Sequence, residues 1–172
     1  MRKPGFTLTY ILLMIAQILL CNFCNFSQYL IVVFLPVMIL CIPIKHGSVF
    51  AMCAAFVTGF AVDFLSSGML GLTSLALVPV AAARKGIIRL VFGSELFSRG
   101  EEISVQRQGL GKSLLAILMV TAVFLVLYIW ADGAGTRPME FNLCKLGFSL
   151  AADTLISYFV CALLTSDEIR WK

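Results

Sequence analysis

The sequence predicts an all-α membrane protein, a bundle of about six transmembrane helices that forms one domain over residues 1–172. Of these residues 60% are hydrophobic and only 13% are charged, and the mean hydropathy is +1.00. A soluble domain of this size needs many more polar side chains on its surface. In lipid, apolar side chains face a suitable solvent, and helices satisfy their own backbone hydrogen bonds.

The apolar segments give the number of helices, because a spanning helix needs roughly 20 apolar residues. Helices are expected at residues 6–24, 29–44, 48–66, 69–83, 113–131 and 141–165. The first is expected to be a retained helix rather than a signal peptide, because no small-residue cleavage site follows it. Pro36, Pro43 and Pro79 fall inside expected helices, where each removes a backbone donor and favours a kink or local unwinding.

The basic residues predict the orientation. All but two of the 13 Lys and Arg residues fall on one side of the expected membrane, and the exceptions are Arg137 and Lys145. Positive residues stay on the cytoplasmic side, so both termini and the long loop at residues 84–112 are predicted to be cytoplasmic. This loop is interpreted either as a solvated connector or as a contact site for a cytoplasmic partner.

The net charge of +4 does not predict a nucleic-acid partner, because the basic residues lie at helix ends and not in a patch interleaved with aromatic residues. The expected environment of the helices is therefore the lipid bilayer.

The six cysteines lie in apolar runs and are expected to act as small hydrophobes. The single histidine, His46, lies beside Lys45 at a turn. No catalytic residues, metal site or cofactor are therefore predicted.

Asp63 is the most informative residue, because a carboxylate near a membrane helix end should face protein or water. Ala51, Ala55, Gly59 and Asp63 follow at intervals of four and share one helix face. Such a ridge of small residues lets another backbone approach closely. Two interpretations stay open. The ridge faces a partner or ligand, or it packs internally while Asp63 caps the loop that follows.

A second polar pattern lies on the last expected helix. Ser149, Asp153, Ser157 and Cys161 repeat every four residues and form a stripe on one face. This stripe could line a polar cavity for a ligand or ion. It could equally join helices, because Ser and Asp side chains can form hydrogen bonds across a bundle.

The stretch from Leu35 to Gly93 resembles the rod-shape-determining protein MreD family. The resemblance rests on Pro36 and Pro43, on Gly59-x-x-x-Asp63, and on Gly68 and Leu70-Gly71. It implies that Gly68 and Gly71 belong with the ridge residues as helix-packing or partner-binding positions.

The same resemblance implies a non-enzymatic, multi-pass subunit of the cell-elongation complex in the bacterial inner membrane. Such a subunit works beside MreC, a single-span protein, to maintain cell shape and lateral peptidoglycan synthesis. Through MreC it is linked to the filament protein MreB and to the synthase RodA with its transpeptidase.

Members of that family also resemble, in fold, the substrate-binding subunits of energy-coupling-factor vitamin transporters. The alternative function is therefore that of such a transporter subunit. A transporter subunit needs a polar cavity open to the outer face, and Asp153 could form its floor. Tryptophans often stack on ligands in such cavities, but Trp130 and Trp171 both lie at helix ends, where interface anchoring explains them. An enzyme would need convergent catalytic groups, and the sequence offers none.

Overall fold

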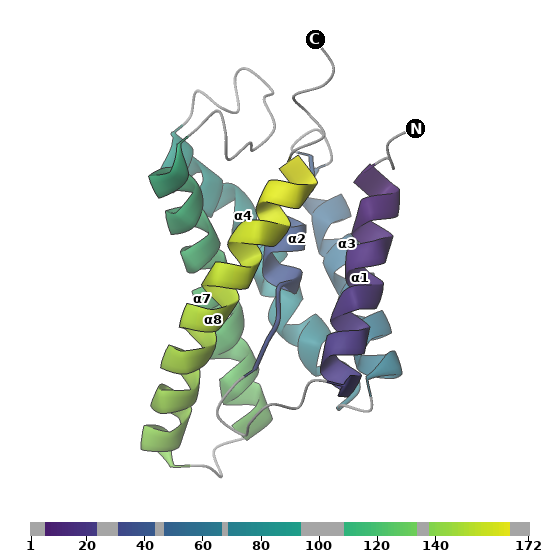
Figure 1. Cartoon of the computed structure of the whole chain (residues 1–172), viewed down its shortest axis with the longest axis vertical. Helices are drawn as coiled ribbons and strands as arrows, with labels where there is room; N and C mark the ends of the chain where they lie inside the picture. The colour runs from purple at the N-terminus through teal and green to yellow at the C-terminus, as the bar shows by residue number, and fades with distance from the viewer. Residues whose placement is uncertain are drawn as a thin grey trace.

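The computed structural model describes residues 6–23, 31–43, 47–66, 69–93, 109–133 and 138–165 (Figure 1). In these ranges the chain forms six helices and no strands, which confirms the predicted all-α class for the described residues. The helices are α1 Phe6–Phe23, α2 Leu35–Leu40, α3 Ser48–Leu65, α4 Leu72–Phe92, α7 Leu110–Gly133 and α8 Met139–Thr165.

Three of the described helices are long and apolar enough to cross a membrane, namely α3, α7 and residues Met139–Leu164 of α8. The apolar part of α1, Thr7–Phe23, is somewhat shorter. Large apolar side chains also cover the outer surfaces of the helices, as a lipid environment requires. The fold is therefore compatible with a helical membrane protein.

The helix expected at residues 29–44 is mostly absent. Of residues 31–43, only Leu35–Leu40 are helical, and residues 31–34 form an irregular segment that leads into α2. Pro36 lies in the first turn of α2, where a missing N–H group costs no hydrogen bond within the helix. The prolines therefore do more than kink this segment, because they confine its helix to six residues.

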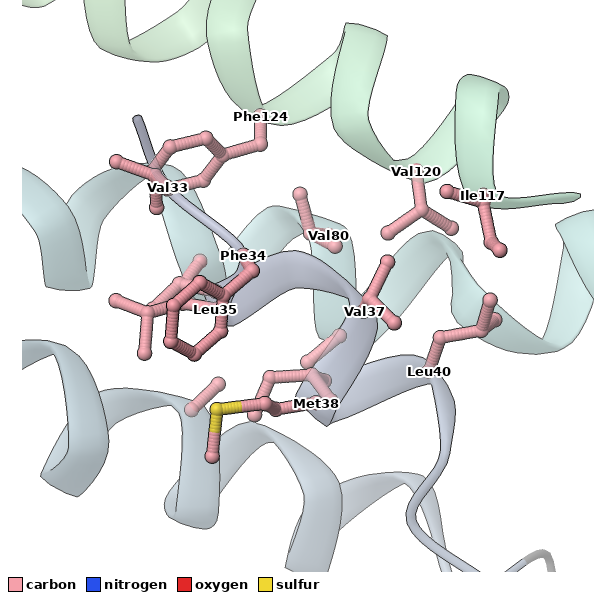
Figure 2. Packing of buried hydrophobic residues seen from close by; sticks show 14 of the residues in the cluster. Val33, Phe34, Leu35, Val37, Met38, Leu40, Val80, Ile117, Val120 and Phe124 are labelled. Carbon is pink, nitrogen blue, oxygen red and sulfur yellow. The ribbon is translucent and has the colours of Figure 1, made fainter. Parts of the chain in front are cut away.

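The short α2 lies in the middle of the bundle, surrounded by the longer helices (Figure 1). All six of its side chains are buried, and it contacts each of the other five described helices. Figure 2 shows Ile117, Val120 and Phe124 of α7 pointing toward residues 33–40. The hydrophobic core of the described residues is thus built around α2.

The prediction that a loop begins at Arg84 is wrong for residues 84–92, because α4 continues as a helix to Phe92. Arg84, Ile87 and Ile88 are all buried, so this part of the chain has an inward face that packs. Pro79 lies inside α4 on an exposed position and does not end it. The predicted loop residues 94–108 lie outside the described residues.

Candidate functional site at the centre of the bundle

The irregular segment at residues 31–34 has its backbone hydrogen bonds supplied by side chains from two other helices. The Ile31 N–H donates to Ser149 Oγ at 2.9 Å, and the Val33 N–H donates to Asp153 Oδ1 at 2.9 Å. Unpaired backbone groups are costly in an apolar interior, and a non-helical segment cannot pair its own. The two α8 side chains therefore replace hydrogen bonds that a continuous helix would have made.

Gln17 of α1 supplies two further bonds to this segment. Its Oε1 accepts the Phe34 N–H at 3.1 Å, and its Nε2 donates to the Val32 carbonyl oxygen at 3.0 Å. The side chain is fully buried, and a buried amide is stable only when both of its ends are paired. Gln17, Ser149 and Asp153 together are called the backbone clamp below. Gln17 is not predicted as a site residue from the sequence, where its only signal is one polar residue within an apolar run.

Arg84 holds the other end of α2. Its Nε donates to the Leu40 carbonyl oxygen at 3.2 Å, and its Nη2 donates to that of Ile42. The last carbonyl groups of a helix have no partner within the helix, so the guanidinium provides one. From the sequence, Arg84 is predicted only as a loop residue that sets the topology. The side chain is 4% exposed and helps to fix the central helix.

The polar stripe of α8 is buried along its whole length and faces the central segment. Ser149 and Asp153 bind the backbone of residues 31–34, and Cys161 Sγ lies 3.4 Å from Cys41 Sγ just after α2. Ser157 Oγ and the second carboxylate oxygen, Asp153 Oδ2, have no hydrogen-bond partner among the described residues. The stripe thus joins α8 to the chain around α2 and leaves two buried oxygen atoms unused.

The ridge on α3 packs inside the chain, against α4. Ala51, Ala55, Gly59 and Asp63 are all buried. A Cβ atom at Gly59 would lie 2.7 Å from both the backbone N and the Cα of Ser74, closer than real contacts allow. Only glycine therefore permits this approach of α3 and α4. These contacts fit the interpretation of internal packing.

Asp63 joins the same two helices at their connecting turn. Its Oδ2 accepts the Thr73 N–H at 2.9 Å, and Thr73 is the second residue of α4. The first N–H groups of a helix have no partner within the helix, so the carboxylate caps α4. Gly71 precedes α4 with a backbone φ of +90°, which favours glycine. Gly68 lies outside the described residues.

Two further polar contacts join helices away from the centre. Lys145 of α8 forms an ion pair with Asp132 of α7 at 3.2 Å. This contact gives a structural role to Lys145, one of the two basic residues that fall on the side of the expected membrane opposite to the other eleven. Tyr10 of α1 and Thr58 of α3 share a hydrogen bond of 2.9 Å. Within the described ranges, no three His, Cys, Asp or Glu residues gather in a way that could hold a metal ion.

A comparison with protein-family models found no matching family, and comparisons with curated proteins and with solved structures found no match. The class of protein is therefore defined by the fold and the site alone. The described residues form an all-helical protein of the membrane type, in which a short central helix is held by polar side chains of α1, α4 and α8.

Proposed function

We propose that the chain is a non-enzymatic, multi-pass subunit of the bacterial cell-elongation complex that binds a single-span partner similar to MreC. One observation carries the proposal. Three residues of the MreD-like pattern, Gly59, Asp63 and Gly71, meet at the joint between α3 and α4. Each has a distinct physical role there: close packing, capping and the turn.

The proposed topology has six crossings, with both termini in the cytoplasm of the inner membrane. In this topology α1, the segment around α2, and α4 cross the membrane in addition to the three long apolar helices. Two features support it. The first residue of α1 and the last turn of α8 lie at the same end of the bundle (Figure 1). The C-terminal end of α4 lies there too (Figure 1). The last two turns of α4 contain Lys85 and Arg89, as the positive-inside rule requires of a cytoplasmic end.

A partner contact would use the outer faces of the bundle, because the ridge on α3 is occupied by α4. These outer faces carry large exposed apolar side chains, which suit both lipid and the helix of a single-span protein. The proposed links to MreB and to RodA with its transpeptidase would then pass through the single-span partner or through the loop that follows α4.

The alternative function, a substrate-binding subunit of a vitamin transporter, is favoured by the two unpaired oxygen atoms of Asp153 and Ser157 within the bundle. The position of α2 weighs against it. A transporter subunit needs room for a vitamin between its helices, whereas the middle of this bundle is occupied by six buried side chains of α2.

The test is a pull-down of the tagged chain from native membranes in mild detergent, followed by mass spectrometry. Recovery of a single-span MreC-like protein, absent from a pull-down of an unrelated multi-pass protein with the same tag, supports the proposal. Recovery of an ATPase pair with a coupling subunit and no elongation protein favours the transporter. Recovery of neither, when the solubilised membranes contain the MreC-like protein, contradicts the proposal.

A further inference from the structure

The inference concerns the unused oxygen atoms on the α8 stripe. Asp153 and Ser157 are both 0% exposed and lie one helical turn apart on the same face. Asp153 Oδ1 is occupied by the Val33 N–H, but Asp153 Oδ2 and Ser157 Oγ have no hydrogen-bond partner in the described part of the chain. Buried polar atoms are nearly always paired, so these two unpaired oxygen atoms require an explanation.

A third buried oxygen without a partner in the described part of the chain belongs to Thr121 of α7. The contact between Lys145 and Asp132 aligns the antiparallel helices α7 and α8. Thr121 precedes Asp132 by as many residues as Ile156 follows Lys145, and both helices rise about 1.5 Å per residue. This residue count places Thr121 near the level of the turn between Asp153 and Ser157. Its hydroxyl is fully buried and has no partner among the described residues.

No cationic side chain of the helices packed against α8 neutralises Asp153. These helices are α1, α2 and α7. The ranges 6–23 and 31–43 contain no charged residue, and their titratable groups are Tyr10, Cys21 and Cys41. On α7, Lys112 lies exposed in the first turn, while Tyr128 and Asp132 lie near the other end.

The two buried cations nearby are already engaged. Lys145 is paired with Asp132 and lies eight residues from Asp153, or about 12 Å along α8. Arg84 of α4 binds the carbonyl groups at the end of α2. The remaining titratable groups of α8 are Glu140, Cys144, Tyr158 and Cys161, and none of them brings a positive charge. A lone carboxylate ion in such an interior is too costly to persist.

We propose that Asp153, Ser157 and Thr121 form a binding site for a single positive charge, supplied by a proton on Asp153 or by a sodium ion. In either case the charge of the carboxylate is neutralised, and the hydroxyl oxygens of Ser157 and Thr121 accept the proton's hydrogen bond or coordinate the ion. The site is linked to the core, because the other oxygen of Asp153 holds residue 33. The proposal does not depend on the proposed scaffold function.

The experiment uses the full chain in lipid nanodiscs at neutral pH and compares it with Asp153→Asn, which keeps the acceptor for Val33 but removes the charge. If a proton is bound, infrared spectra show the carbonyl band of a protonated carboxylic acid, which disappears in Asp153→Asn. If sodium is bound, the chain melts several degrees higher in sodium chloride than in N-methylglucamine chloride, and Asp153→Asn abolishes the difference. A wild-type chain with neither signal overturns the proposal.

Ser157→Ala and Thr121→Val test the site without touching the carboxylate, in case Asp153→Asn does not fold. Each is expected to move the acid band to higher frequency, through loss of a hydrogen bond, or to reduce the sodium effect. Thr154→Ala is the matched control on α8, since the Thr154 hydroxyl donates to the Leu150 carbonyl of its own helix at 2.6 Å. Signals that are unchanged in both test variants, or that change equally in the control, overturn the proposed site.

Discussion

The carboxylate of Asp153 accepts a hydrogen bond from the backbone N–H of Val33, a residue 120 positions earlier in the chain. This contact fixes the irregular segment before α2 to the long helix α8. The neighbouring N–H groups of Ile31 and Phe34 donate to Ser149 Oγ of α8 and to Gln17 Oε1 of α1. A segment that cannot pair its own backbone is thereby held at the centre of an apolar bundle.

Replacement of Asp153 by alanine should destabilise the fold more than replacement by asparagine. Alanine leaves the Val33 N–H without an acceptor, whereas asparagine keeps an oxygen in place. We expect Asp153→Ala to lower the free energy of unfolding by about 1–3 kcal/mol relative to Asp153→Asn. Denaturation of the purified variants in mixed detergent micelles measures this difference. Equal stability of the two variants would show that the bond to Val33 contributes nothing.

Gln17→Leu keeps the approximate size of the side chain but removes both of its bonds to residues 32 and 34. We expect a loss of about 2 kcal/mol or more, because a donor and an acceptor are left unpaired in an apolar site. Leu12→Ala, on the exposed face of α1, is the control and should change stability much less. The same denaturation assay applies, and a Gln17→Leu variant as stable as the wild type contradicts the prediction.

Gly59→Ala should separate α3 from α4. The added methyl group would lie 2.7 Å from backbone atoms of Ser74, so the helices must shift, at a cost of about 1–3 kcal/mol. Gly86→Ala on α4 is the matched control, because nothing lies within 4 Å of its added Cβ and alanine favours the helix. A lower melting temperature is expected for the first variant only. Similar melting of both would mean that the α3–α4 contact tolerates a side chain.

Under the proposed function, Asp63→Ala should weaken assembly of the complex and disturb cell shape without removing an enzymatic activity. It removes the cap from the Thr73 N–H, which costs about 1 kcal/mol and loosens the joint that carries the family-like pattern. Recovery of the MreC-like protein in the pull-down, together with cell shape, measures the effect. Asp63→Asn retains an acceptor and should be milder. Full complex formation and normal shape in Asp63→Ala would make Asp63 an ordinary packing residue.

Cys41 and Cys161 should form a disulfide when an oxidant such as copper phenanthroline is added to membranes. Their sulfur atoms are 3.4 Å apart, so a shift of roughly 1–2 Å brings them to bonding distance. Proteolysis between the two positions, followed by electrophoresis without reductant, detects the link between α2 and α8. Cys41→Ser and Cys161→Ser should each abolish it. The absence of a link in the wild-type chain would contradict the placement of α2 beside α8.

Much of the helical framework could be predicted from composition, because long apolar runs have few alternatives to a helix in lipid. The regular spacing of Ser149, Asp153 and Ser157 also indicated a functional face, and the small residues before Asp63 indicated close packing. Spacing along one helix does not reveal what lies opposite, however. The partner of Asp153 is a backbone group 120 residues away, and no periodic pattern encodes such a pairing.

The structural roles of two other residues could not be predicted, for related reasons. A single Gln17 in an apolar run gives no indication that both ends of its amide are used. Arg84 was interpreted from its charge as a residue of a loop, but its guanidinium binds carbonyl groups that are free to accept its bonds because α2 ends at Leu40. Pro36 and Pro43 indicated a disturbance in this region, although not its extent.

The central position of α2 also constrains the order in which the protein can be completed during synthesis. The ribosome makes residues 31–43 early, but two members of the backbone clamp, Ser149 and Asp153, belong to the last described helix. Until α8 enters the membrane, the N–H groups of Ile31 and Val33 lack these acceptors. The packing around α2 can therefore be completed only after α8 has been made. Until then, the earlier helices must stay far enough apart for α8 to insert beside residues 31–43.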